Sequence, residues 1–305
     1  MNTPLVSICC ITYNHAQFIR KCLDGFLMQQ TDFPIEILIH DDCSTDGTTE
    51  IIREYEAKYP ELIFPLYEEE NQYQHGKAAE IDFYNYRRAR GKYIAYCEGD
   101  DYWTDSLKLQ KQVDFMEANP EYSVCFHYFY AFDNNTNKIS IHKAISPLES
   151  MDVTTEMYLN NSFYGQPLTM LFRVSMFDFR WCKLYKYYCD THEIYHLLSM
   201  GKGRLLDFVG GIYNMHKAGV ASSIVNPQQI AKGVLETCKE LYIHNSHDKV
   251  IQNFLYNILL WNYNVLSYEF WHIFGKCFFI SPIIILKVLF TITKRRFKKI
   301  ILSKL

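Results

Sequence analysis

The chain has 305 residues, of which 49% are hydrophobic and 16% aromatic, a composition typical of a globular protein and not of a disordered one. This length can form one large domain or two. The formal net charge of -3 argues against a nucleic-acid-binding protein when the chain is taken as a whole.

Two features indicate the compartment. The ten cysteines contain no CxxC pair and no His/Cys cluster at zinc spacing, so we expect free thiols in a reducing environment. Neither a basic segment nor a long apolar stretch precedes Pro4, so the sequence predicts no secretory signal peptide. Together they favour a protein inside the cell.

The first hundred residues alternate between strand and helix patterns. Short apolar, β-branched runs predict strands, and apolar residues at helical spacing predict helices. Strands that alternate with helices indicate an α/β fold with a mostly parallel central sheet and flanking helices. The expected strands are 5–12, 35–40, 63–67 and 93–96, and the expected helices are 16–30, 46–59 and 78–90.

The rest of the chain is less regular. Residues 139–187 show no clear pattern, and after about residue 226 the sequence becomes helical and rich in Leu, Ile, Asn and Tyr. We therefore expect a catalytic domain over 1–225 and a helical extension over 226–305. Within the catalytic domain, after residue 100, we expect helices at 108–119 and 192–200 and strands at 123–132 and 205–213. The last strand leads to His216.

Polar clusters follow three of the early strands: Thr12-Tyr13-Asn14, Asp41-Asp42, and Glu98 to Asp101. Ligands of open α/β sheets bind beyond the carboxyl ends of the strands. The third cluster places three carboxylates within four residues, which would repel one another if left unpaired. A divalent cation would relieve that repulsion, and carboxylate oxygens suit Mg²⁺ or Mn²⁺. The alternative is an acidic turn on a solvated face.

Three ordered segments resemble an inverting family-2 glycosyltransferase with the GT-A fold. They are VSICCITYNHAQFIRKCLDGFLMQQ, IEILIHDDCSTDGTTEII and RGKYIAYCEGDDYW. The resemblance spans about residues 4–222. It implies a bacterial surface-polysaccharide enzyme that binds a nucleotide-sugar donor, with a UDP-sugar as the default, and a glycan or lipid-linked glycan acceptor.

The resemblance also implies donor-binding residues. Asp42, together with Asp41, would accept hydrogen bonds from the base or ribose, and Thr12, Tyr13 and Asn14 would line the same pocket. Lys77 would face the diphosphate, or would be an ordinary solvated lysine. The alternative for the second acidic turn is a helix cap, because Ser44 and Asp46 precede a predicted helix.

The metal motif of the family is usually Asp-x-Asp, and Glu98, Gly99 and Asp100 match it with Asp101 following. The resemblance implies that Mn²⁺ or Mg²⁺ is held by Asp100 and by Asp101 or Glu98. His216 would be a further metal ligand or would contact the diphosphate. The choice among the three carboxylates stays open. Asn214 stands where the family often has Arg, so a phosphate contact from that position is lost.

Asp190 matches the family's general base, which takes the proton from the attacking acceptor hydroxyl. Glu193 is the competing candidate, one helical turn later. The alternative role for Asp190 is an N-cap on the helix that begins near Thr191.

Two other classes of protein remain possible. A sugar nucleotidyltransferase also uses an α/β sheet and a metal, but it usually carries a glycine-rich loop after the first strand, and Thr12 to Gln17 contains no glycine. A non-catalytic GT-A-like binding protein would not need the acidic turn together with Asp190 and His216.

The tail combines an apolar stretch, Phe278 to Ile292, with the basic cluster Lys294 to Lys299. The apolar stretch is shorter than the roughly 20 residues of a spanning helix. This pattern predicts peripheral attachment to the anionic inner face of the cell membrane, in the cytoplasm. The alternative is a buried helix with a solvated basic end.

Overall fold

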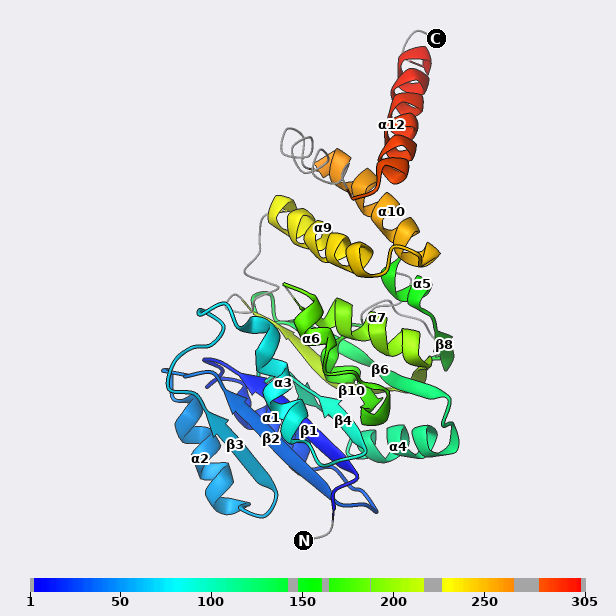
Figure 1. The fold of residues 1–305 in the computed structure, drawn as a ribbon. Coiled ribbons are helices and arrows are strands. Elements are labelled where there is room, and N and C mark those ends of the chain that lie inside the picture. Colours follow the sequence, from blue (N-terminus) through cyan, green and yellow to red (C-terminus); the bar gives the residue numbers. More distant parts are fainter. Residues whose placement is uncertain are drawn as a thin grey trace. The chain divides into compact units, whose positions relative to one another are not determined.

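The computed structural model describes residues 3–141, 148–160, 165–186, 188–216, 227–265 and 280–302. The chain divides into two compact units, Met1–Lys217 and Ala218–Leu305 (Figure 1). The predicted domain boundary after residue 225 lies outside the described residues.

The first unit is built around one sheet in the order β3-β2-β1-β4-β9-β6-β10-β5, with β7 paired to β6 and β8 paired to β10. The first four strands are parallel to one another, as predicted. The other half is mixed, because β9 runs antiparallel between β4 and β6. The strands are β1 Val6–Thr12, β2 Ile35–Asp41, β3 Ile63–Tyr67, β4 Tyr93–Tyr96, β5 Tyr102–Trp103, β6 Tyr122–Asp133, β7 Lys138–Ile141, β8 Met151–Val153, β9 Leu171–Arg173 and β10 Lys202–Met215.

Helices flank this sheet, which confirms the predicted α/β architecture (Figure 1). The segment 139–187, which showed no pattern, contains several elements of three to five residues, too short for a helical or strand period to appear. The helices of the first unit are α1 Ile19–Leu27, α2 Thr48–Lys58, α3 Ala78–Arg88, α4 Lys108–Ala118, α5 Thr155–Leu159, α6 Trp181–Leu184 and α7 Asp190–Met200, with 3₁₀ turns at Pro167–Thr169 and Val174–Met176.

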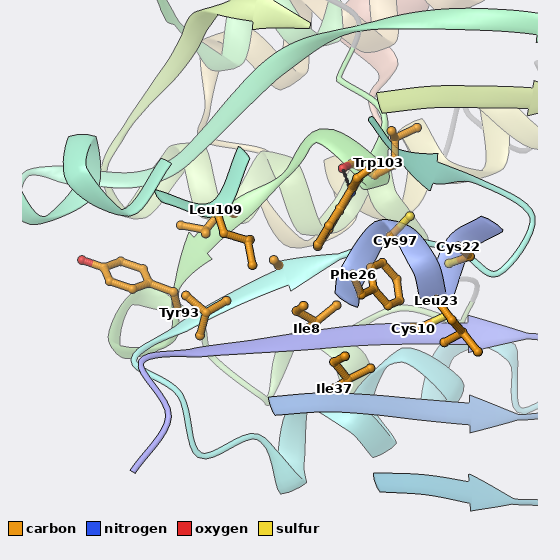
Figure 2. Close-up of a cluster of buried hydrophobic side chains, with 14 of the residues drawn as sticks. Ile8, Cys10, Cys22, Leu23, Phe26, Ile37, Tyr93, Cys97, Trp103 and Leu109 are labelled. Carbon is orange, nitrogen blue, oxygen red and sulfur yellow. Dashed lines mark hydrogen bonds between the residues drawn. The ribbon is translucent and has the colours of Figure 1, made fainter. Parts of the chain in front are cut away.

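The main core lies between one face of the sheet and helices α1 and α4 (Figure 2). In α1, Ile19, Cys22, Leu23 and Phe26 are fully buried, and this i, i+3, i+4, i+7 spacing forms one helix face. A side chain such as Phe26 contributes about 1.5–3 kcal/mol by leaving water. The sheet residues that meet this face include Ile8, Cys10, Ile37, Tyr93 and Cys97.

Lys108, the first residue of α4, is an ionisable side chain that is buried in this core. Its Nζ lies 3.6 Å from the centre of the Trp103 ring and has no hydrogen-bond partner among the described residues. A cation–π contact contributes about 2 kcal/mol at best, less than burial of an unpaired ammonium costs. Burial therefore lowers the pKa of Lys108 to about 7.

The second unit consists of α9 Pro227–His244, α10 Lys249–Val265 and α12 Pro282–Leu302. Helix α10 packs against both α9 and α12, and the Tyr256 hydroxyl lies 2.8 Å from Thr291 Oγ1. Pro282, which interrupts the apolar stretch in the sequence, is the first residue of α12, where its missing N–H costs nothing. No helix in the described ranges is long and apolar enough to cross a membrane.

We expect Lys108→Met to stabilise the protein by about 2–4 kcal/mol at pH 7, because the unfolded chain gains more from protonating this amine than the folded chain does. The folded-state pKa lies below the unfolded one, so wild-type stability should fall as the pH drops from about 10 towards 7. Thermal unfolding across that range should show a flatter pH profile for the variant. If the pH dependence of stability is the same in Lys108→Met as in the wild type, the buried amine is not neutral. Lys111→Met is an exposed control on the same helix.

Candidate active site

The carboxyl ends of β2, β1 and β4 lie side by side in the sheet. Thr12 is in register with Asp41, and the N–H of Asp42 donates to the carbonyl of Thr12 at 3.0 Å. On the other side of β1, the N–H of Gly99 donates to the carbonyl of Ile11 at 2.9 Å. The structure therefore brings the three polar clusters of the sequence to one edge.

Asp100 lies at the centre of this edge. Its Oδ2 is 2.9 Å from Nε2 of His216, which follows β10, and 3.7 Å from Nε2 of His15, which follows β1. Burial alone would raise the pKa of Asp100, but the hydrogen bond from His216 and the nearby imidazole of His15 hold that pKa below its usual range. The second oxygen, Oδ1, is buried without a hydrogen-bond partner in the described part of the chain.

Asp101 is tied to β10 through Asn214. The N–H of Asn214 donates to Asp101 Oδ1 at 2.8 Å, and its side-chain amide donates to the carbonyl of Asp100 at 2.6 Å. Burial, and then the charges of Asp100 and Glu98, raise the pKa of Asp101 well above its ordinary value. Asn214, which stands where the family often has Arg, thus supports the acidic turn through these two hydrogen bonds.

Two sets of side chains have ligand atoms within 4.8 Å of one another: Glu98 with Asp100 and Asp101, and His15 with Asp100 and His216. Mutually repelling carboxylates, a buried unpartnered oxygen and two imidazoles are a donor set that suits a divalent transition-metal ion or Mg²⁺. The residues present therefore fit the expected cation. His15 was missed by the sequence reasoning, although its position directly after Thr12-Tyr13-Asn14 was a usable signal.

Gly99 is required by close packing inside the site. A Cβ at this position would lie 2.6 Å from Thr12 Oγ1 and 3.1 Å from His15 Nδ1. The glycine therefore lets the acidic turn approach the end of β1.

Asp41 and Asp42 are both buried and hold loops in place. Asp41 accepts hydrogen bonds from the N–H of Ser44 at 3.2 Å and from the hydroxyl of Thr49. Asp42 accepts from the N–H groups of Gln72 and Tyr73 at 2.6 and 3.1 Å. Each carboxylate oxygen has a further lone pair, so contact with a ligand remains a prediction for both residues.

The N-cap of α2 is Gly47, which has no side-chain capping bond, so neither Ser44 nor Asp46 is the N-cap residue. Asp46 accepts from the N–H of Thr48, the first residue of α2, at 3.1 Å, and from the N–H of Ala16 at 3.0 Å. These bonds hold the pKa of Asp46 below its usual value although its burial acts in the opposite direction. Asp46 thus links the first residue of α2 to the loop after β1.

The remaining donor-side candidates differ in exposure. Thr12 is buried and Tyr13 is exposed. Asn14 adopts a positive φ of 55°, and its Oδ1 accepts from the N–H of Thr45 at 2.8 Å, so it joins two loops. Lys77 is exposed and donates to Gln72 Oε1 at 2.9 Å, beside the loop that holds Asp42.

Asp190 and Glu193 lie in the first turn of α7. Glu193 is only 3% exposed and accepts from the Tyr86 hydroxyl at 3.0 Å, whereas Asp190 is accessible to solvent. The N-cap is Cys189, whose N–H donates to His192 Nδ1 at 3.2 Å, so capping does not account for Asp190. Asp190 as a whole residue is exposed. The protein atoms packed around its carboxyl group nevertheless disfavour the charged form and raise its pKa.

The first turn of α7 is connected to the end of β4 through Tyr86. The ring of Tyr86 lies edge-on to Tyr96, the last residue of β4, with centroids 6.2 Å apart. Since the acidic turn follows β4 directly, this contact and the Tyr86–Glu193 hydrogen bond link α7 to the base of the acidic turn.

Two bacterial proteins resemble parts of the chain. The uncharacterized protein Rv1520 of Mycobacterium tuberculosis is 49% identical over 122 residues, 40% of this chain and 34% of that protein. The putative teichuronic acid biosynthesis glycosyltransferase TuaG of Bacillus subtilis is 40% identical over 113 residues, 37% of this chain and 42% of TuaG. The matched stretches therefore span less than half the length of these relatives.

Solved structures share the fold. The S. aureus TarS 1-349 complex with UDP-GlcNAc aligns with a TM-score of 0.60 at 18% identity, over 85% of this chain and 72% of that one. The mannosyltransferase PcManGT of Pyrobaculum calidifontis, in complex with GDP-Man and Mn²⁺, aligns with a TM-score of 0.53 at 16% identity, over 96% and 80%. Glycosyl transferase family 2 matches residues 7–188, more than half of the chain, and the protein therefore belongs to this family.

Proposed function

We propose that the first unit transfers a sugar, with inversion, from a nucleotide diphosphate sugar to a hydroxyl of a glycan or lipid-linked glycan during surface polysaccharide synthesis. The observation that carries the proposal is Asp100 at the strand ends, where two imidazoles lie near its Oδ2. Its Oδ1 is buried without a hydrogen-bond partner among the described residues. Family membership and the name of TuaG support this class of reaction.

A UDP-sugar is the simplest donor to propose. TarS was solved with UDP-GlcNAc, whereas PcManGT was solved with GDP-Man, so related folds accept more than one nucleotide. In this chain Thr12, Tyr13 and the loops held by Asp41 and Asp42 would surround the nucleoside. The exposed Lys77 would approach the diphosphate from the loop that Asp42 anchors.

The proposed reaction is a direct displacement at the anomeric carbon. Asp190 takes the proton of the acceptor hydroxyl while that oxygen forms the new bond to the sugar. The bond from the anomeric carbon to the phosphate oxygen breaks, and its electron pair leaves with the nucleotide diphosphate. A Mn²⁺ or Mg²⁺ ion held by Asp100, with Glu98, Asp101 or His216, would offset the charge of that leaving group.

A raised pKa suits Asp190 for this task, because a general base works best when its proton affinity is close to the working pH. Glu193 is a weaker candidate, since its carboxylate is buried against Tyr86. Neither a nucleotidyltransferase nor a pure binding protein has a specific observation in its favour.

We expect Asp190→Asn to lower the rate of sugar transfer by about 10²–10⁴-fold with little change in donor affinity, because it removes the base and leaves the strand ends intact. Asp100→Asn should instead weaken metal-dependent donor binding. Released nucleotide diphosphate should be measured over a panel of activated sugars with Mn²⁺, using water and simple glycosides as acceptors. Glu193→Gln is the matched control, and full transfer by Asp190→Asn would refute the base.

We propose that the second unit attaches the enzyme to an anionic membrane surface, on the cytoplasmic face, through α12. Ile283, Leu286 and Phe290 are 68%, 60% and 71% exposed, and their i, i+3, i+7 spacing aligns them along one face of the helix. The sequence from Lys294 to Lys299 adds five positive charges after this apolar segment. Apolar side chains beside basic residues match an anionic lipid surface.

The triple variant Ile283→Ser, Leu286→Ser, Phe290→Ser should reduce co-sedimentation with phosphatidylglycerol-containing vesicles by about tenfold or more, since each apolar side chain adds roughly 1 kcal/mol or more of burial. The control is Ile139→Ser, Met200→Ser, Ile243→Ser, which removes exposed apolar residues elsewhere. Equal co-sedimentation of the two triple variants with vesicles would contradict the proposed attachment. A chain that lacks residues 277–305 and still sediments like the wild type would also contradict it.

A further inference from the structure

His15 is held in a fixed orientation from two sides. Its backbone N–H donates to Thr48 Oγ1 at 2.8 Å, and its ring Nδ1 lies 3.1 Å from Thr12 Oγ1. The other ring nitrogen, Nε2, is 3.7 Å from Asp100 Oδ2. The imidazole is therefore positioned by β1 and α2, with its Nε2 directed at the acidic turn.

His216 approaches the same carboxylate oxygen from β10. Its Nε2 is 2.9 Å from Asp100 Oδ2, and the two imidazole rings are perpendicular with centroids 6.1 Å apart. Phe18 packs against both rings, at 4.5 Å from His216 and 6.5 Å from His15. Two histidines far apart in sequence thus converge on one carboxylate.

The distance from His15 Nε2 to Asp100 is too long for a hydrogen bond, so His15 does not fix that carboxylate by direct bonding. In the tautomer whose Nδ1–H donates to Thr12 Oγ1, the Nε2 atom presents a lone pair towards Asp100 and His216. Metal-ligating histidines usually have this arrangement, in which the second ring nitrogen donates to a neighbouring oxygen.

We propose that His15 is a ligand of the divalent cation, and that His15, Asp100 and His216 form an imidazole-rich donor set that favours Mn²⁺ over Mg²⁺. The inference rests on the proposed metal dependence of the enzyme and adds a residue and a selectivity to it. Imidazole suits transition metals, whereas Mg²⁺ prefers oxygen ligands. The ion would replace the proton that joins His216 to Asp100.

The test is direct Mn²⁺ and Mg²⁺ binding to the full-length protein with UDP as the probe, without any sugar transfer. Free Mn²⁺ is followed by electron paramagnetic resonance, and Mg²⁺ is measured by competition. We expect His15→Gln to weaken Mn²⁺ binding by about 10–100-fold and Mg²⁺ binding by only about threefold or less. Spin-echo modulation from ¹⁴N should show one fewer imidazole on Mn²⁺ in the variant.

His15→Asn is a second variant in case the first fails to fold, with folding monitored by circular dichroism, and the exposed His247→Gln is the matched control. Unchanged Mn²⁺ affinity and ¹⁴N modulation in both His15 variants would overturn the ligand role alone. Equal weakening of both metals would instead indicate a purely structural histidine. Absence of Mn²⁺ binding to the wild-type protein would overturn the metal dependence as well.

Discussion

The contact between Asp100 and His216 is the constraint on which the candidate site depends. It joins the turn after β4 to the end of β10, 116 residues later in the chain, and the bonds from Asn214 to Asp100 and Asp101 reinforce it. Asp101 is buried there among like charges, which the protein tolerates only because its Oδ1 is paired with a backbone N–H. The acidic turn is thus fixed by β10 in the arrangement that the proposed cation would require.

Many polar groups at this edge also support the fold. Asp41, Asp42 and Asp46 each accept at least two hydrogen bonds that hold the loops after β1, β2 and β3. The loops that would enclose a nucleotide are therefore fixed by the same carboxylates that the family resemblance assigns to ligand binding. Such sharing ties the shape of the donor pocket to the integrity of the sheet edge.

The two units of the chain differ in how they use their apolar residues. In the first, strands buried on both faces give a rigid edge on which side chains can be held to a fraction of an ångström. In the second, α12 buries Ile284, Ile285, Val288 and Ile292 on one face and leaves apolar residues exposed on another. A helix of this kind has a second, unused apolar surface, which is the physical basis for the proposed membrane attachment.

The amino-acid sequence was enough to predict the alternation of strands and helices in the first hundred residues and the polar clusters after β1, β2 and β4. Both follow from local periodicity, and parallel strands necessarily bring their carboxyl ends to one edge. Only the tertiary structure decided that His15 and His216 converge on Asp100, that Asn214 supports the acidic turn, and that Glu193 is buried while Asp190 is accessible. These relations join residues up to 116 positions apart, and they depend on how β9 and β10 add to the sheet, which no local pattern specifies.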